Sequence, residues 1–252
     1  MTENEARKIM ERARDTGSPL PNIAEYSEAL RKTYEILGSN YTEKQLDNWI
    51  LCGKYPFLIP RYDWSGEIVK DYDYTSTYLD DIPVGWKIAF GEMMCEEIKQ
   101  ELVRCNYLNE YRILQIKEKY GGLRWYDNGT PIGCKVQEII DKYSVLSENI
   151  CIICGKPDVP MTNNGWISPY CKKCYTTPSD WYKEEYPDKI DEWIEFHSDD
   201  WEYFNNENGN NMLNSYTVKK WSKEKGDEEI TYDISETADK IRSKWRAEHG
   251  KN

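Results

Sequence analysis

The chain has 252 residues, enough to bury a core in one large domain or in two small ones. Its 45 acidic and 33 basic residues give a net charge of −12, which disfavours generic binding of nucleic-acid backbones, because such binding needs clustered lysine and arginine. No apolar stretch has membrane-spanning length, and residues 1–15 lack the hydrophobic run of a secretion signal. We therefore expect a cytoplasmic protein that keeps its thiols reduced.

Residues 1–53 are predicted to form short N-terminal helices. Thr2 with Glu5 and Thr42 with Gln45 have the spacing of capping boxes, which mark helix starts. Apolar periodicity predicts another helix over 23–37, which Gly38 would end. Three short helices can include a helix-turn-helix, but these lack the basic face that a DNA reader needs.

Residues 54–148 are predicted to form a central α+β domain. Its aromatic first part, 54–83, is expected to be extended with short strands, and helices are expected over about 84–105 and 135–147. Between these helices, Gly121-Gly122 suits a two-residue primed turn of a β-hairpin, because both turn residues need positive φ. This register would pair Tyr120 with Leu123.

The predicted hairpin carries a basic face. Lys117, Lys119 and Arg124 would share it with Tyr126, and such a group could hold a phosphate or an acidic partner. The alternative, which we favour, is a solvated face balanced by nearby carboxylates. Glu118 is expected on the opposite face, paired with a cation or carrying a raised pKa if it is buried.

Four of the eight cysteines form two C-x-x-C pairs within 149–175. Cys151 and Cys154 make the first pair, Cys171 and Cys174 the second. This spacing predicts a four-thiolate zinc ribbon or treble clef that is structural, since four ligands leave no position for substrate. The other four cysteines lack paired spacing, so we do not expect a second metal site from them: Cys52, Cys95, Cys105 and Cys134.

Residues 176–252 are predicted to form an acidic, aromatic-rich and mainly helical region. From 175 onward the chain carries 19 acidic and 11 basic residues. A helix over 188–204 would place its apolar residues on one side, a loop would follow at 205–211, and a last helix would span 234–247. The acidic side of the first helix would carry six carboxylates: Asp188, Asp191, Glu192, Glu195, Asp199 and Glu202.

This acidic helix has two interpretations. It can be an ordinary surface helix with its carboxylates in water. It can also be an acidic, aromatic-rimmed surface that occupies a basic nucleic-acid groove on another protein, because helical carboxylates are spaced about 5–6 Å apart along a face. The first is the more common situation, and the second is the more specific.

Several segments resemble uncharacterised proteins of phages and gut bacteria. The resemblance covers about residues 55–175 and is carried by YPFLIPRYDWSGE (55–67), VGWKIAFGEMMCEEI (84–98), QIKEKYGGLRWYDNG (115–129) and the two C-x-x-C pairs (151–174). It implies a mobile-element setting and supports the zinc ribbon, but it implies no activity. The helical N-terminal part and the acidic region are not covered.

The chain offers little for catalysis. Its only histidines are His197, expected on the apolar side of the acidic helix, and His249, expected to be unordered near the C-terminus. Triad, Cys–His and H-E-x-x-H chemistry therefore lack their residues, and no phosphate-binding or nucleophile-elbow motif occurs. Glu97-Ile98-Lys99 has the E-x-K order of some nucleases but lies in a predicted helix. We expect a protein that is not an enzyme.

Three functional hypotheses remain. The first is a non-enzymatic accessory protein of a phage or mobile element that binds and inhibits a host protein, for example a nucleic-acid-handling defence effector such as a CRISPR nuclease (an anti-CRISPR). The second is a nucleic-acid-binding module that uses the zinc ribbon, with Lys172 and Lys173 between its ligands, and the basic hairpin face. The third is a metal-dependent hydrolase. We rank them in this order.

Overall fold

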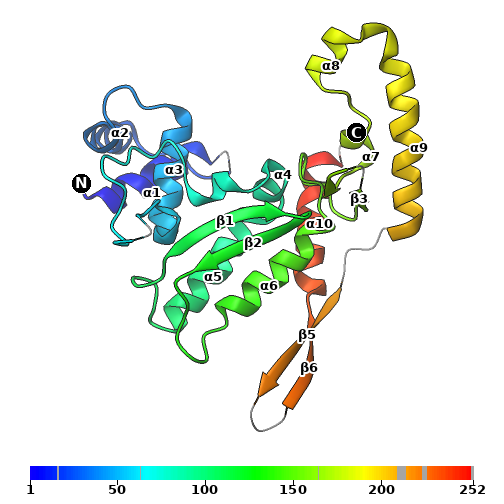
Figure 1. Ribbon diagram of the computed structural model, residues 1–252. Helices are drawn as coiled ribbons and strands as arrows, with labels where there is room; N and C mark the ends of the chain where they lie inside the picture. Colours follow the sequence, from blue (N-terminus) through cyan, green and yellow to red (C-terminus); the bar gives the residue numbers. More distant parts are fainter. Residues whose placement is uncertain (16, 63, 164, 209–213, 223–225, 251–252) are drawn as a thin grey trace. The chain divides into compact units, whose positions relative to one another are not determined.

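The computed structural model describes residues 1–15, 17–62, 64–163, 165–208, 214–222 and 226–250 (Figure 1). Helices predominate, and the described strands form two-stranded sheets, which confirms the predicted α+β class. The chain divides into two compact units made of interleaved segments. Unit 1 comprises Met1–Asp81, Lys99–Gln115 and Tyr126–Cys134, and unit 2 comprises Ile82–Ile98, Ile116–Trp125 and Lys135–Asn252.

Unit 1 begins with the three predicted helices, α1 (Glu3–Arg14), α2 (Ile23–Leu37) and α3 (Glu43–Lys54). Both expected capping boxes are present, so in α1 the N–H groups of Thr2 and Glu5 donate to each other's side chains, and in α3 those of Thr42 and Gln45 do the same. The helices enclose one apolar core, and the Arg7 guanidinium lies 4.1 Å from the Trp49 ring centroid. The buried members of this core are Ala6, Ile9, Met10, Ala29, Leu46 and Trp49.

The expected extended segment after α3 contains the short 3-10 helices η1 (Pro56–Leu58) and η2 (Tyr78–Asp81) and an isolated β-bridge between Arg61 and Ile68. The long helix predicted over 84–105 is present as three consecutive parts. These are α4 (Val84–Trp86), a π-helical turn η3 (Lys87–Gly91) and α5 (Glu92–Arg104). Helix α6 (Val136–Ser147) matches the prediction.

The hairpin turn lies one residue earlier than predicted. Strand β1 (Ile113–Lys119) ends before Tyr120, and β2 (Gly122–Asp127) begins directly after Gly121. Tyr120 and Gly121 have φ of 54° and 75°, so they are the two turn residues, and a tyrosine takes the left-handed position that we assigned to a glycine. The predicted pairing of Tyr120 with Leu123 is therefore wrong.

The second half of unit 2 contains a short helix, over 180–185, and a β-hairpin that the sequence did not predict. After β3 (Met161–Asn163), β4 (Ile167–Pro169), α7 (Lys172–Tyr175), α8 (Asp180–Glu185) and η4 (Pro187–Lys189), helix α9 spans Ile190–Asn208. The unpredicted hairpin consists of β5 (Ser215–Ser222) and β6 (Gly226–Asp233), in which Tyr216 pairs with Tyr232.

The two remaining predictions for this part concern the loop and the last helix. Helix α9 continues to Asn208, beyond the start of the loop expected at 205–211, and the rest of that loop lies outside the described residues. The last helix, α10 (Ser235–His249), is present as predicted. Among the described residues, none of the helices combines the length and the apolar character that a membrane crossing requires.

Candidate metal centre

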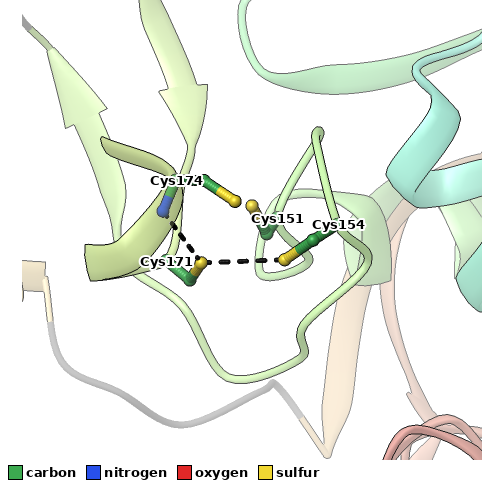
Figure 2. Close-up of side chains that lie close together, drawn as sticks. All are labelled: Cys151, Cys154, Cys171 and Cys174. Atoms are coloured by element: carbon green, nitrogen blue, oxygen red, sulfur yellow. Dashed lines mark hydrogen bonds between the residues drawn. The ribbon is translucent and has the colours of Figure 1, made fainter. Parts of the chain in front are cut away.

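The four cysteines of the two C-x-x-C pairs come together in unit 2. Their sulfur atoms all lie within 4.8 Å of one another, and the sulfurs of Cys154 and Cys171 are 3.7 Å apart. Figure 2 shows the four side chains turned toward a common centre, one pair from a loop and the other from the start of a short helix. Four convergent thiols can hold one metal ion, as the spacing predicted.

The first pair lies in a tight loop after α6. The N–H of Gly155 donates to the carbonyl of Cys151 at 2.9 Å, and the N–H of Cys151 donates to the carbonyl of Lys156 at 2.9 Å. Gly155 has a φ of 80°, so this loop requires the backbone freedom of glycine. The loop thereby turns both sulfurs to the same side.

The second pair lies at the start of α7. Cys171 is the N-terminal cap of this four-residue helix, and its sulfur accepts a hydrogen bond from the N–H of Cys174 at 3.4 Å. The β3–β4 hairpin connects the two pairs, and its carbonyl at Pro169 accepts from the N–H of Ile152 at 3.1 Å. Along the chain, a loop with the first pair is followed by a β-hairpin and then by a helix with the second pair. This is the element order of a treble-clef zinc fold.

The thiols cannot all ionise without a cation among them. Hydrogen bonds from the thiols of Cys151 and Cys154 lower the pKa of Cys171. Hydrogen bonds with Cys151 and Cys171 raise the pKa of Cys154, and burial raises the pKa of Cys174 to about 12. One thiolate therefore forms readily and disfavours the others, whereas a divalent cation at their centre would stabilise all of them.

The first loop is fixed by close contacts within unit 2. A Cβ on Gly85 would lie 2.1 Å from the carbonyl oxygen of Cys151, so α4 approaches the loop at a distance that only glycine allows. The Trp86 indole donates to the carbonyl of Ile150 at 2.9 Å. From α10, Arg242 donates to the carboxylate of Asp158 at 2.9–3.2 Å. The loop that carries Cys151 and Cys154 is thus fixed by a close backbone approach, a hydrogen bond and an ion pair, in addition to any metal that its cysteines bind.

Helix α9 is attached to the segment that carries the second cysteine pair. The Trp201 indole donates to the carbonyl of Tyr170 at 2.9 Å, and Lys172 forms an ion pair of 2.6 Å with Glu202. The Tyr175 hydroxyl donates to the carboxylate of Asp200. We call the segment 149–175, which carries the four cysteines, the knuckle. Its contacts with α9 are made by residues directly next to Cys171 or Cys174.

The predicted acidic face of α9 is exposed along its whole length. All six predicted carboxylates lie at exposed positions, including Glu202 with its ion pair: Asp188, Asp191, Glu192, Glu195, Asp199 and Glu202. The predicted apolar side is only half-buried, and Ile194 is exposed. Sequence periodicity missed Phe196 and Tyr203, which are 61% and 60% exposed on the acidic side.

The predicted basic patch lies on one face of the β1–β2 hairpin, but its members differ. Lys119 and Tyr126 are exposed, whereas Lys117 and Arg124 are half-buried. The Arg124 guanidinium donates to the carbonyl of Leu123 at 3.0 Å and to the Ser144 hydroxyl at 3.3 Å. Arg124 is therefore engaged within the fold, which leaves Lys119 as the most exposed cation of the patch.

The expected partner of Glu118 is replaced by a backbone group. Its carboxylate accepts a hydrogen bond from the N–H of Gly121 at 2.6 Å, so it stabilises the hairpin turn.

Glu97, the glutamate of the E-x-K sequence, makes contacts that stabilise the fold. It accepts a hydrogen bond from the Tyr143 hydroxyl at 2.8 Å and forms an ion pair with Lys142. This ties α5 to α6, and no further acidic group is brought to Glu97 by these contacts.

Both histidines stack on a tryptophan one helical turn earlier. Trp193 and His197 have ring centroids 3.5 Å apart on α9, and Trp245 and His249 have them 3.6 Å apart on α10. His197 is half-buried, as expected. The expectation that His249 is unordered is wrong, because α10 extends through it and its ring contacts Trp245.

A second group of possible ligands occurs in unit 1. Glu101, Cys105 and Cys134 have ligand atoms within 4.8 Å of one another. Arg104 already supplies a cation there, since it donates to both carboxylate oxygens of Glu101 at 2.5–2.7 Å and to the carbonyl of Gly133 at 2.8 Å. Cys52 and Cys95 are buried, whereas Cys105 and Cys134 are half-buried. Arg104 explains the cluster without a metal.

Comparisons with protein-family models, with curated proteins and with solved structures found no match to this chain.

Proposed function

We propose that Cys151, Cys154, Cys171 and Cys174 bind one structural zinc ion. A tetrahedron with metal–sulfur distances of about 2.3 Å has edges of about 3.8 Å, close to the 3.7 Å between the sulfurs of Cys154 and Cys171. Four thiolates suit zinc or an iron centre, and a closed four-coordinate knuckle is the form that structural zinc takes. Elemental analysis of the purified protein tests this: we expect one zinc per chain and no iron absorption.

We further propose that the protein is a non-enzymatic interaction protein that binds a partner protein through α9. The observation that carries this proposal is the outward stripe formed by Glu192, Phe196, Asp199 and Tyr203, which we call the α9 stripe. Its residues are spaced by four, three and four positions, so they follow one side of the helix. All four side chains are exposed.

The composition of the α9 stripe favours a basic groove as its binding site. Two large aromatic side chains that remain in water on a folded helix are suitable anchors for a partner's pockets. The carboxylates between them would favour a surface rich in lysine and arginine and would accelerate association. Grooves that bind nucleic acid have this charge, so we infer that the partner is a nucleic-acid-handling protein. The resemblance to mobile-element proteins suggests a host defence effector and an inhibitory outcome.

The nucleic-acid-binding alternative has weaker support. Of the predicted basic residues, Arg124 donates to Leu123 and Ser144, and Lys172 pairs with Glu202 of α9. Lys119 and Lys173 remain as exposed cations on the hairpin and on α7. Two such lysines give a small electrostatic gain against a net charge of −12.

Affinity purification from a bacterial host at low salt tests the proposed function, with and without nuclease treatment. We expect a nuclease-resistant host protein that is released at high salt and is lost from the double variant Phe196→Ala/Tyr203→Ala. Trp181→Ala is the matched control, since Trp181 is a similarly exposed aromatic residue (64%) on α8, outside the α9 stripe. Recovery of nucleic acid alone, or equal recovery by both variants, would contradict the proposal.

A further inference from the structure

A pocket lined by aromatic rings lies beside the metal centre. Its volume is about 360 Å³, and residues of β3, α7, α8 and α9 contribute to it, together with the metal ligand Cys174. Its rings include Trp166, Tyr170, Tyr175, Tyr182, Trp193 and His197. We call it the aromatic pocket. None of the α9 stripe residues lines the pocket, and the Phe196 ring lies 5.2 Å from the His197 ring at the border between the two.

The rings form a continuous wall. Trp193 and His197 stack with an interplanar angle of 19°, which the spacing of four residues on α9 makes possible. The Tyr182 ring lies 5.8 Å from Trp193, and the Tyr175 ring lies 5.6 Å from His197. Ring faces carry negative electrostatic potential, so several rings around one space attract a cation.

The polar groups of the pocket also favour a cation. The Nδ1 atom of His197 lies 2.8 Å from the carbonyl oxygen of Trp193, and since a carbonyl only accepts, Nδ1 carries the hydrogen. Nε2 of the neutral ring is then an acceptor. The Tyr175 hydroxyl donates to Asp200, which places a carboxylate at the hydroxyl end of that ring. None of the described lining residues is a lysine or an arginine.

The neighbouring metal centre adds negative charge. Four thiolates around one divalent cation carry a formal net charge of −2, and Cys174 belongs both to this centre and to the pocket lining. Two neighbouring lysines are paired with carboxylates: Lys172 with Glu202 at 2.6 Å, and Lys183 with Asp180 at 2.8 Å. Lys173, next to Cys174, is exposed and does not line the pocket. The electrostatics of the pocket therefore disfavour anionic ligands.

We propose that the aromatic pocket receives an arginine side chain of the partner protein. A guanidinium is planar, stacks on aromatic faces, is weakly hydrated and always charged, and it donates to acceptors at its edge. The rings would hold its faces, and His197 Nε2 or the hydroxyls of Thr177 and Ser179 at the pocket would accept from its N–H groups. This inference rests on the proposed function, since a basic groove would supply the arginine, and it adds a specific recognition site.

The test uses two model ligands that differ only in charge and one atom. N-acetyl-arginine methylamide and the neutral isostere N-acetyl-citrulline methylamide are titrated into the metal-loaded protein, with indole N–H resonances followed by NMR. Trp193→Phe assigns the relevant resonance. We expect a saturable shift of the Trp193 resonance with the arginine ligand and none with the citrulline ligand. Equal responses to both ligands, or no response to either, would overturn the proposal.

A pocket variant and a stripe variant separate this inference from the proposed function. Tyr182→Leu removes one ring from the half-buried wall, and we expect it to weaken arginine binding about fivefold or more at unchanged metal content. Tyr203→Ala changes the α9 stripe away from the pocket, since its ring contact is with Phe204, which does not line the pocket, and it should leave arginine binding unchanged. Unchanged arginine binding by Tyr182→Leu would contradict the pocket. Arginine binding without stripe-dependent partner capture would instead contradict the proposed function and leave the pocket in place.

Discussion

The helical N-terminal part and the metal-binding knuckle are stabilised by different means. Helices α1–α3 enclose a core that includes three residues with no exposed surface, Ala6, Ala29 and Trp49. The buried core of the knuckle consists of Val159 and two of the ligands, Cys151 and Cys171. Burial of apolar surface therefore accounts for the first region, whereas the second would depend on the metal ion that we propose for its four cysteines. The difference is one of scale: the knuckle has a small core made largely of its own possible metal ligands, so metal binding and core formation would be the same event there.

Removal of a metal ligand should have the largest effect. Structural zinc contributes on the order of 10–16 kcal/mol in small zinc-binding peptides, so we expect Cys151→Ser to lose the metal and to unfold the knuckle, while α1–α3 keep their hydrogen-exchange protection. Elemental analysis and hydrogen exchange measure both effects. A variant with full metal content and an unchanged melting temperature would contradict the site.

Truncation of a side chain in the N-terminal core should do the opposite: it should destabilise α1–α3 and leave the knuckle unchanged. Trp49 is fully buried, and replacing a buried tryptophan with alanine costs about 3–5 kcal/mol. We expect Trp49→Ala to lower the free energy of unfolding of α1–α3 in urea while the metal content stays at that of the wild type. Loss of metal from this variant would show that the two regions do not depend on separate interactions.

Gly85 tests the contact between α4 and the first cysteine pair. Since an added Cβ would lie 2.1 Å from the carbonyl oxygen of Cys151, Gly85→Ala must displace the metal loop, at a cost of about 1–3 kcal/mol. We expect a lower melting temperature and faster metal loss to a chelator. Gly17→Ala is the matched control, because its Cβ would meet only the Asp15 carboxylate at 3.5 Å. Equal chelation rates in the two variants would refute the role of Gly85.

The smallest expected effect depends on pH. Burial raises the pKa of Glu148, and the nearby Arg124 offsets part of this change. A carboxyl group with a raised pKa in the folded protein binds its proton more tightly there than in the unfolded chain. The folded state therefore loses stability as pH rises above the ordinary value of 4.5.

Replacement by the neutral glutamine removes this dependence. We expect Glu148→Gln to be as stable as the wild type at pH 4 and slightly more stable at pH 7, by about 0.5 kcal/mol or less. Urea unfolding at both pH values measures the difference. If the variant is instead less stable than the wild type at pH 7 and equally stable at pH 4, the ionised Glu148 carboxylate stabilises the fold and the prediction is wrong.

Local chemistry predicted the metal centre, the helix caps and the long helices. The C-x-x-C pairs and the capping residues act over a few positions, so their spacing specifies their geometry. The hairpin turn was missed because Tyr120 adopts a positive φ that is rare for residues other than glycine. In that turn the Glu118 carboxylate accepts from Gly121, a contact that spacing did not indicate.

The β5–β6 hairpin was missed because its stabilising contacts are not local. Tyr216 and Tyr232 stack across the strands with ring centroids 5.1 Å apart, and the hydroxyl of Tyr216 donates to the carbonyl of Glu138 on α6 at 3.1 Å. The partner of that hydroxyl lies 78 positions earlier in the chain. The exposed Phe196 and Tyr203 were missed for a related reason, since helical periodicity predicts which residues can be buried but not how wide the covered face is.

The attachment of α9 to the knuckle has a consequence for where and when the protein can work. Tyr170 and Lys172 flank Cys171 and Tyr175 follows Cys174, so the position of the helix is set by the same segment that a bound metal would order. A chain synthesised in a metal-starved cell would carry the complete α9 stripe without a fixed support for it. Binding of the partner would then follow the metal supply of the cell, although no metal atom touches the partner.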